Sequence, residues 1–121
     1  MIAADTSALI AFLEGVPGRA VEQLGAAAVG GNLVLPPVVI VETLSAAAQL
    51  QAILQNLAFL EIKPGYWDRA GHNRRLLREK GLKANLGDTL IAQSCIDHDV
   101  PLITRDEDFR HFAKHCGLKL A

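Results

Sequence analysis

Residues 1–15 read MIAADTSALIAFLEG, and the order of residue types in this stretch predicts how the chain begins to fold. The segment IAA is short and apolar, which is typical of a buried strand, and Asp5 ends it. The residues after it, TSALIAFLEG, begin with Thr6 and Ser7, either of which can cap a helix that Gly15 then closes. The stretch therefore predicts a buried strand that ends at an acidic residue and leads directly into a helix.

The rest of the chain continues this alternation of short apolar runs and longer helical patterns. Proline and glycine mark several ends of the apolar runs, as at Pro36 and Pro37. We expect strands over 2–5, 32–36, 58–64 and 100–104, an edge strand over 117–121, and helices over 6–15, 18–31, 38–57, 66–81, 88–99 and 106–117. Strands that alternate with helices imply a single α/β domain over residues 1–121, an α/β/α sandwich with a mostly parallel sheet of four to five strands.

The composition limits the class of protein. A chain of 121 residues is large enough for one packed core, and half of its residues are hydrophobic although few are aromatic. The formal charge of −1 is no global sign of a nucleic-acid binder, but a local basic patch would suffice. The N-terminus lacks the basic start of a signal peptide, and no apolar run approaches the ~20 residues that span a bilayer. We therefore expect a cytoplasmic protein with reduced thiols and no membrane partner.

Four acidic residues are placed at the edge where open α/β sheets bind ligands, beyond the carboxyl ends of the strands. Asp5 follows the first strand, and Asp106 follows the strand that ends at Thr104. Asp88 stands in a favourable N-cap position for the helix that leads into that same strand. Glu42 lies in the first turns of a largely apolar helix, where a charge is seldom buried without a partner. We expect these four acids to converge on one rim.

Four converging carboxylates imply a cation, because their mutual repulsion would otherwise raise their pKa values and destabilise the fold. Oxygen ligands without histidine or thiolate favour Mg²⁺ or Mn²⁺ over zinc. Such a centre can activate water, orient a phosphodiester and stabilise a leaving oxygen. Thr6, Ser7 and Thr104 are the hydroxyl groups expected to support the carboxylates by hydrogen bonds.

Four short motifs occur in order along the chain: DTSAL from Asp5, VETLS around Glu42, GDTLIA around Asp88 and LITRDEDF around Asp106. Together they cover nearly the whole chain, and in this order the chain resembles a PIN-domain ribonuclease, more narrowly a VapC toxin of a prokaryotic toxin–antitoxin pair. The resemblance implies Mg²⁺- or Mn²⁺-dependent cleavage of RNA by a homodimer that a small antitoxin protein neutralises.

The resemblance also assigns roles to the acids. Residues matching Asp5 and Asp88 are the usual metal ligands of that family, and those matching Glu42 and Asp106 complete its catalytic metal site. The segment TRDEDF offers two candidates for the fourth acid. Asp106 matches the family position, whereas Asp108 is expected to support the site or to cap the last helix.

A basic run from Arg69 to Lys83 carries six basic residues against the single acid Glu79. Its arginines Arg74, Arg75 and Arg78 are candidates for binding RNA phosphates, and a solvated helix face is the alternative interpretation. His111 and His115 have the spacing of a zinc-binding pair next to Cys116, but no second pair of ligands accompanies them.

Other functions are considered on the same residues. A PIN-fold module that binds RNA or protein without catalysis would keep the fold, and metal-dependent cleavage would separate it from a nuclease. A receiver domain would need paired acids after the first strand and a late lysine. A haloacid-dehalogenase-like phosphatase would need a second aspartate where Ser7 stands. Both phosphotransfer classes are therefore disfavoured.

Overall fold

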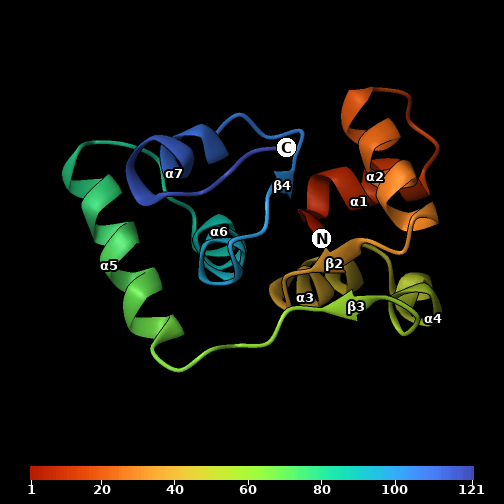
Figure 1. Ribbon diagram of the computed structural model, residues 1–121, viewed down its shortest axis with the longest axis horizontal. Helices are drawn as coiled ribbons and strands as arrows, with labels where there is room; N and C mark the ends of the chain where they lie inside the picture. The colour runs from red at the N-terminus through yellow and green to blue at the C-terminus, as the bar shows by residue number, and fades with distance from the viewer.

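The computed structural model describes residues 1–121, which form a four-stranded parallel sheet flanked by helices (Figure 1). The strands are β1 (Ile2–Ala4), β2 (Leu33–Leu35), β3 (Ala58–Phe59) and β4 (Leu102–Ile103). The helices are α1 (Thr6–Leu13), α2 (Arg19–Val29), α3 (Val38–Ala46), α4 (Gln51–Leu54), α5 (Tyr66–Glu79), α6 (Leu86–His98) and α7 (Phe109–Cys116). The predicted α/β sandwich with a mostly parallel sheet is confirmed.

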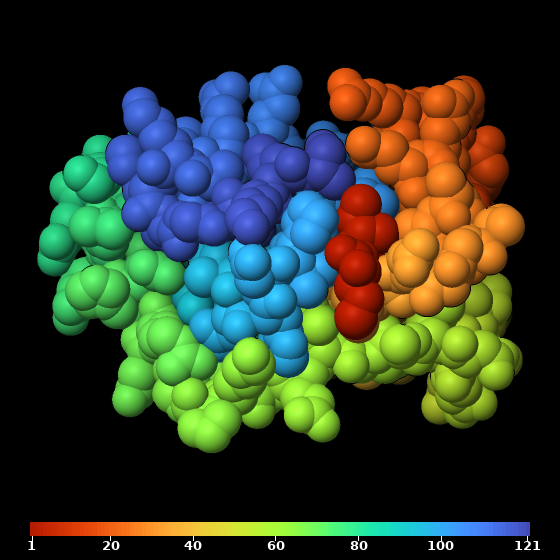
Figure 2. Space-filling model, viewed as in Figure 1, coloured from red at the N-terminus to blue at the C-terminus, as the bar shows by residue number.

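The strand order is β3-β2-β1-β4, so the first strand of the chain lies in the middle of the sheet. Ala3 pairs with Val34 of β2 on one side and with Leu102 of β4 on the other, both in parallel. Figure 2 shows the N-terminal residues in red, bordered by orange residues of the α2–β2 region and blue residues of the C-terminal half. Because β1 and β4 are neighbours and parallel, their carboxyl ends meet at one edge.

The core is mainly aliphatic, as the composition predicts. Ala3 and Ala4 of the central strand are fully buried, and their small side chains allow the covering helices to approach the sheet closely. The fully buried aromatic side chains are Phe109 and Phe112 of α7, whose ring centroids lie 6.2 Å apart. The core thus joins the N-terminal strand to the last helix and ties both ends of the chain to the sheet.

The helix predicted over 38–57 is wrong as a single element. It ends at Ala46, because Ala47 has an extended backbone (φ −155°, ψ 97°), and a 3-10 turn over Ala48–Leu50 precedes α4. Ala46 and Ala48 are exposed on either side of the break. The break instead returns Leu54 to the core and brings β3 beside β2.

Two smaller expectations about element ends also need correction. The cap of α1 is Asp5, whose carboxylate accepts a hydrogen bond from the Ala8 amide, rather than Thr6 or Ser7. Asp88 is the third residue of α6 and not its cap, because the helix starts two residues earlier. An aspartate is favoured in the first turn of a helix as well as at its N-cap, so the residue type of Asp88 does not distinguish the two positions.

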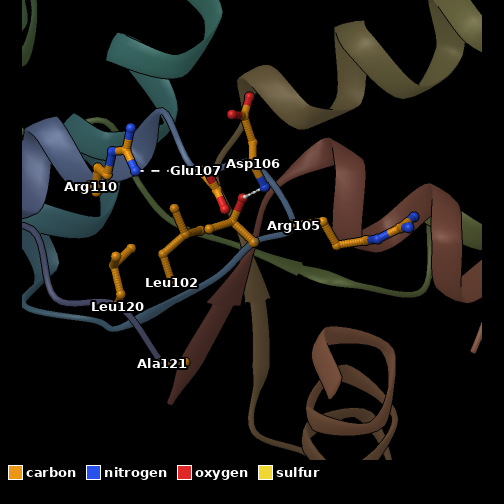
Figure 3. A pocket seen from close by; sticks show the side chains of 8 residues that line it. Leu102, Arg105, Asp106, Glu107, Arg110, Leu120 and Ala121 are labelled. Carbon is orange, nitrogen blue, oxygen red and sulfur yellow. Dashed lines mark hydrogen bonds and ion pairs between the residues drawn. The ribbon is translucent and has the colours of Figure 1, made fainter. Parts of the chain in front are cut away.

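The C-terminal residues form less of a strand than predicted. A single parallel bridge joins Leu120 to Leu102, and the amide of Ala121 donates to the Leu102 carbonyl at 2.9 Å. Figure 3 shows Leu120 and Ala121 beside Leu102 at this edge of the sheet. The expected edge strand over 117–121 is therefore reduced to one bridge, which still fixes the tail against β4.

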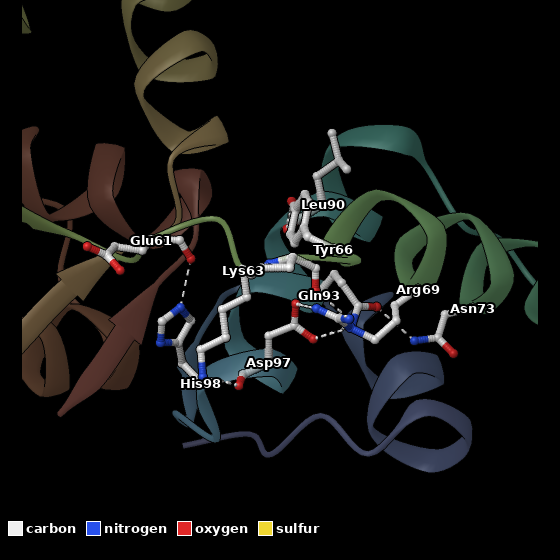
Figure 4. A network of polar contacts seen from close by, with 10 residues as sticks. Glu61, Lys63, Tyr66, Arg69, Asn73, Leu90, Gln93, Asp97 and His98 are labelled. Carbon is white, nitrogen blue, oxygen red and sulfur yellow. Dashed lines mark hydrogen bonds and ion pairs between the residues drawn. The ribbon is translucent and has the colours of Figure 1, made fainter.

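A polar network holds α5 against α6 (Figure 4). The amide of Asn73 donates to Gln93, and the amide of Gln93 donates to Asp97, at 2.8 and 2.9 Å. Arg69 makes two hydrogen bonds to the same Asp97 carboxylate, at 2.9 and 2.6 Å, and its guanidinium lowers the pKa of that carboxyl. Gln93 is buried with both of its polar ends paired, so the network fixes the helix that carries Asp88.

No helix of the protein combines the length and the apolar character that a membrane span requires.

Candidate metal centre

Asp5 ends the central strand and is only 2% exposed. Its carboxylate accepts hydrogen bonds from the Ser7 hydroxyl, 2.8 Å from Oδ1 and 2.9 Å from Oδ2, and from the Ala8 amide at 2.8 Å. The Thr104 hydroxyl donates to Oδ2 from the end of β4. Burial raises the pKa of Asp5, the hydrogen bonds from Thr104, Ala8 and Ser7 oppose the rise, and the charge of Asp106 adds to it.

Glu42 reaches the same edge from the first turns of α3. The Thr6 hydroxyl donates to its Oε1 at 2.6 Å, so the residue after Asp5 orients a second acid. The other oxygen, Oε2, lies against Gly87 at the start of α6. A Cβ atom on Gly87 would stand 2.6 Å from Oε2, closer than any normal contact. The absence of a side chain at Gly87 therefore leaves room for the Glu42 carboxylate.

Asp88, Asp106 and Asp108 each offer a carboxylate oxygen, and these three oxygens lie within 4.8 Å of one another. The pKa of Asp88 is raised to about 6, first by burial and then by the charges of Asp106, Glu42, Asp5 and Asp108. Asp106 is held in place by its neighbours, because its amide donates to Thr104 Oγ1 at 2.9 Å and its Oδ1 accepts from the Asp108 amide at 2.9 Å.

The four acids expected to converge all line one hollow of about 450 Å³: Asp5, Glu42, Asp88 and Asp106. Thr6 and Ser7 line it as well, and Thr104 reaches it through its hydrogen bond to Asp5. The structure thus brings together residues from β1, α3, α6 and the segment after β4. Their roles as ligands or catalysts stay predictions.

The two candidates for the fourth acid face different surroundings. Asp106 lines the hollow, whereas Asp108 lies outside its lining and pairs with Lys83 Nζ at 3.1 Å. Asp108 occupies the N-cap position of α7 but makes no side-chain hydrogen bond to the helix. Which of the two serves as the fourth acid stays a prediction, because Asp106 lines the hollow and Asp108, at the N-cap position of α7, also brings a carboxylate oxygen within 4.8 Å of those of Asp88 and Asp106.

Sequence reasoning missed several residues around the hollow. Glu14 and Arg105 line the hollow. Gly87 leaves room for the Glu42 carboxylate, and Lys83 forms an ion pair with the neighbouring Asp108. Glu14 had a usable signal, since it stands two helical turns after Ser7 and therefore on the same face. Gly87 belongs to the GDTLIA motif, but its contact with Glu42 and the pairing of Lys83 with Asp108 depend on how distant segments pack.

The basic arginines of α5 lie elsewhere. Arg74, Arg75 and Arg78 line a separate hollow of about 430 Å³ on α5, outside the lining of the acidic hollow. Arg74 Nε donates to the Ala84 carbonyl at 2.9 Å, which ties this face to the loop before α6. The possible zinc ligands His111, His115 and Cys116 do not form a group whose ligand atoms are close enough to hold an ion.

The donor set fits a hard divalent cation. Apart from Arg105, the polar side chains that line the hollow offer carboxylate or hydroxyl oxygens, the ligands that Mg²⁺ and Mn²⁺ prefer, and the remaining lining is apolar (Ile10, Ala11 and Ile91). Burial and then the charges of neighbouring acids raise the pKa of Asp88, and a bound cation would offset those charges. Asp88, Asp106 and Asp108 bring carboxylate oxygens within 4.8 Å of one another, and Asp5 and Glu42 line the same hollow as Asp88 and Asp106.

Fold and site together define a small α/β domain whose parallel sheet carries an acidic, metal-compatible centre at the carboxyl edge of its strands. The chain belongs to the PIN domain family, which matches residues 2–115. No curated protein matches the sequence at a significant level.

Two solved structures have the same fold. One is VapBC2 from Rickettsia felis bound to a DNA fragment from their promoter, with a TM-score of 0.74 and 21% identity, covering 100% of this chain and 98% of that chain. The other is DNA-bound VapBC from Salmonella typhimurium, with a TM-score of 0.74, 16% identity and the same coverage of both chains. At these identities the likeness concerns the fold.

Proposed function

We propose that this protein is a metal-dependent endoribonuclease that hydrolyses RNA phosphodiester bonds, with residues 1–121 as one nuclease domain. One observation carries the proposal: four acids from distant parts of a PIN fold line a single hollow. The pKa of Asp88, raised to about 6, supports it, because perturbed carboxyls crowded in a hollow are typical of functional sites.

Each acid has a role in this proposal. Asp5 and Asp88 hold the ion, and Glu42 and Asp106 complete the site. A bound Mg²⁺ or Mn²⁺ supplies water activation and charge neutralisation at the phosphodiester. Ser7 and Thr104 keep the Asp5 carboxylate in one orientation, and Thr6 does the same for Glu42. No side-chain nucleophile is required.

The basic face of α5 is proposed to bind RNA. Arg74, Arg75 and Arg78 line one hollow, so their guanidinium groups can contact neighbouring phosphates of one strand. Arg75 lies 3.9 Å from Glu79, a pair exposed to solvent and therefore weak, so this interaction would compete little with a phosphate.

Purified protein is expected to cleave single-stranded or structured RNA in the presence of Mg²⁺ or Mn²⁺, and excess chelator should stop the cleavage. The metal dependence should shift with pH, because below the raised pKa of Asp88, about 6, a proton competes with the ion for the carboxylate. The Mg²⁺ concentration needed for half-maximal cleavage should therefore rise as the pH falls through 6. Cleavage of a labelled RNA over a grid of metal concentration and pH measures both effects.

The same experiment distinguishes the nuclease from a PIN-fold module that has no catalytic activity. A PIN-fold module without catalysis would bind RNA or protein and leave the RNA intact in every metal tested. Cleavage that persists at full rate in excess chelator would contradict the proposed mechanism, whereas intact RNA at all metal concentrations would favour the non-catalytic module.

We further propose that the nuclease is the toxin of a type II, VapBC-like toxin–antitoxin pair, acting as a homodimer that a small antitoxin protein binds. The support is the shared fold with chains of two VapBC structures. Expression of the protein should arrest bacterial growth, and co-expression of the product of a short adjacent reading frame should restore it. The matched control is Asp5→Asn, which should express without arrest. An inert wild-type phenotype would remove the toxin role and leave the nuclease intact.

A further inference from the structure

A second hollow, of about 360 Å³, adjoins the acidic hollow (Figure 3). Arg105 and Asp106, in the segment after β4, line both hollows. In Figure 3 the Arg105 side chain extends to one side of this segment, and Arg110 lies on the other. The two hollows therefore share a wall, and that wall carries one acid of the proposed catalytic site and one arginine.

The second hollow has the lining that a nucleotide needs. Arg110 supplies a guanidinium group for a phosphate, Arg105 stands in the wall shared with the acidic hollow, and Leu120, 43% exposed, supplies an apolar wall. A volume of about 360 Å³ lies at the lower end of the range for small-molecule sites, which suits a single nucleotide.

The guanidinium of Arg110 is available for a ligand. Its only recorded ion pair is with Glu107 Oε2 at 3.7 Å, and the two side chains are 66% and 86% exposed. Such an exposed pair at long distance adds little to stability, so a phosphate can replace Glu107 at small cost. Glu107 lines the same hollow and would repel that phosphate, which gives the two residues opposite expected effects.

RNA is a polymer, so a strand whose phosphodiester lies in the acidic hollow must continue beyond it. We propose that the second hollow binds the nucleotide next to the cleaved bond, with its phosphate on Arg110 and with Arg105 at the junction between the two hollows. This inference rests on the proposed ribonuclease function and adds a substrate subsite to it.

Opposite effects of two neighbouring substitutions test the subsite. Arg110→Ala and Glu107→Gln remove the same ion pair, so a purely structural role would change RNA binding in the same direction in both variants. A phosphate subsite predicts that Arg110→Ala weakens binding about threefold to fivefold and that Glu107→Gln strengthens it about twofold, effects of the size of one exposed ion pair. The slope of log affinity against log salt should also become shallower by about 0.7 in Arg110→Ala.

Binding is measured by fluorescence anisotropy of a short labelled single-stranded RNA in excess chelator, which prevents cleavage. Arg19→Ala, on helix α2 and outside the lining of all three hollows, is the matched loss of one exposed arginine and should bind RNA like wild type. Equal affinities for all variants, or changes of the same sign in Arg110→Ala and Glu107→Gln, would overturn the subsite. Failure of wild-type cleavage in metal would instead refute the nuclease, and the binding comparison would still decide the subsite.

Discussion

Asp5→Asn is expected to abolish RNA cleavage while the protein stays folded. Asp5 is the most buried of the four acids, and its carboxylate is held by Ser7, Ala8 and Thr104. Asparagine has the same shape but only one weakly ligating oxygen, so the ion loses a principal ligand. A metal ion supplies several kcal/mol of transition-state stabilisation, so we expect a loss of about 10³-fold or more in the cleavage rate.

The fold should tolerate this change. An amide oxygen in place of Oδ1 still accepts hydrogen bonds from Ala8 and Ser7, and the amide nitrogen can donate to the Thr104 hydroxyl. The pKa of Asp5 is raised by burial, so the folded protein binds this proton more tightly than the unfolded chain does. Ionised Asp5 therefore lowers the free energy of unfolding progressively as the pH rises above 3.8, the ordinary pKa of an aspartate. Asparagine carries no charge and removes that effect.

Thermal melting separates loss of function from loss of fold. In chelator at neutral pH, Asp5→Asn should melt at or above the temperature of wild type, because no buried charge remains. Added Mg²⁺ or Mn²⁺ should raise the melting temperature of wild type, and this rise should shrink in the variant. If the Asp5→Asn variant cleaved RNA at the wild-type rate, Asp5 would not belong to the catalytic site. If the variant lost its cooperative melting transition, Asp5 would have a structural role instead.

The sequence predicts the order of the strands along the chain well because the signals are local, although the strand expected over 58–64 is reduced to Ala58–Phe59. Short apolar runs followed by an acid, as at Asp5, identify both a parallel strand and its carboxyl end, where ligands bind. The helix break at Ala47 lacks such a signal, since alanine favours a helix and only the burial of Leu54 and the pairing of β3 decide against one long helix. Local propensity cannot include these tertiary contacts.

The site divides in the same way. The acids follow from their positions after strands and at helix starts, whereas their surroundings depend on contacts between distant segments. Lys83 forms an ion pair with Asp108 because α5, α6 and α7 pack together, and no spacing in the sequence predicts that ion pair. The structure places Asp106 in the hollow and Asp108 against Lys83, yet it brings the carboxylate oxygens of both within 4.8 Å of Asp88, a closeness that their spacing in the sequence does not predict.

Gly87→Ala is expected to keep or improve stability and yet impair cleavage. Gly87 is the second residue of α6 and has an ordinary helical backbone, so alanine should stabilise the helix by up to about 1 kcal/mol. The new Cβ would stand 2.6 Å from Glu42 Oε2 and 3.3 Å from Glu42 Cδ. These atoms end a flexible side chain, so Glu42 can move away at little cost to the fold.

That movement should affect the site, because Glu42 is held on its other side by the 2.6 Å hydrogen bond from Thr6. A displacement of about 1 Å in a positioned catalytic group can cost about 10²-fold in rate, and we expect a loss of that order for Gly87→Ala. Gly25→Ala is the matched control, since it is a glycine inside helix α2 whose new Cβ meets only Phe12 Cε2, at 3.3 Å, and it lines neither the acidic hollow nor the arginine hollow on α5. It should leave cleavage unchanged. The substitution is expected to move the Glu42 carboxylate and to leave the side chains of Asp5, Asp88 and Asp106 unchanged. If a well-folded Gly87→Ala protein cleaved RNA at the wild-type rate, the position of Glu42 would not be required for cleavage.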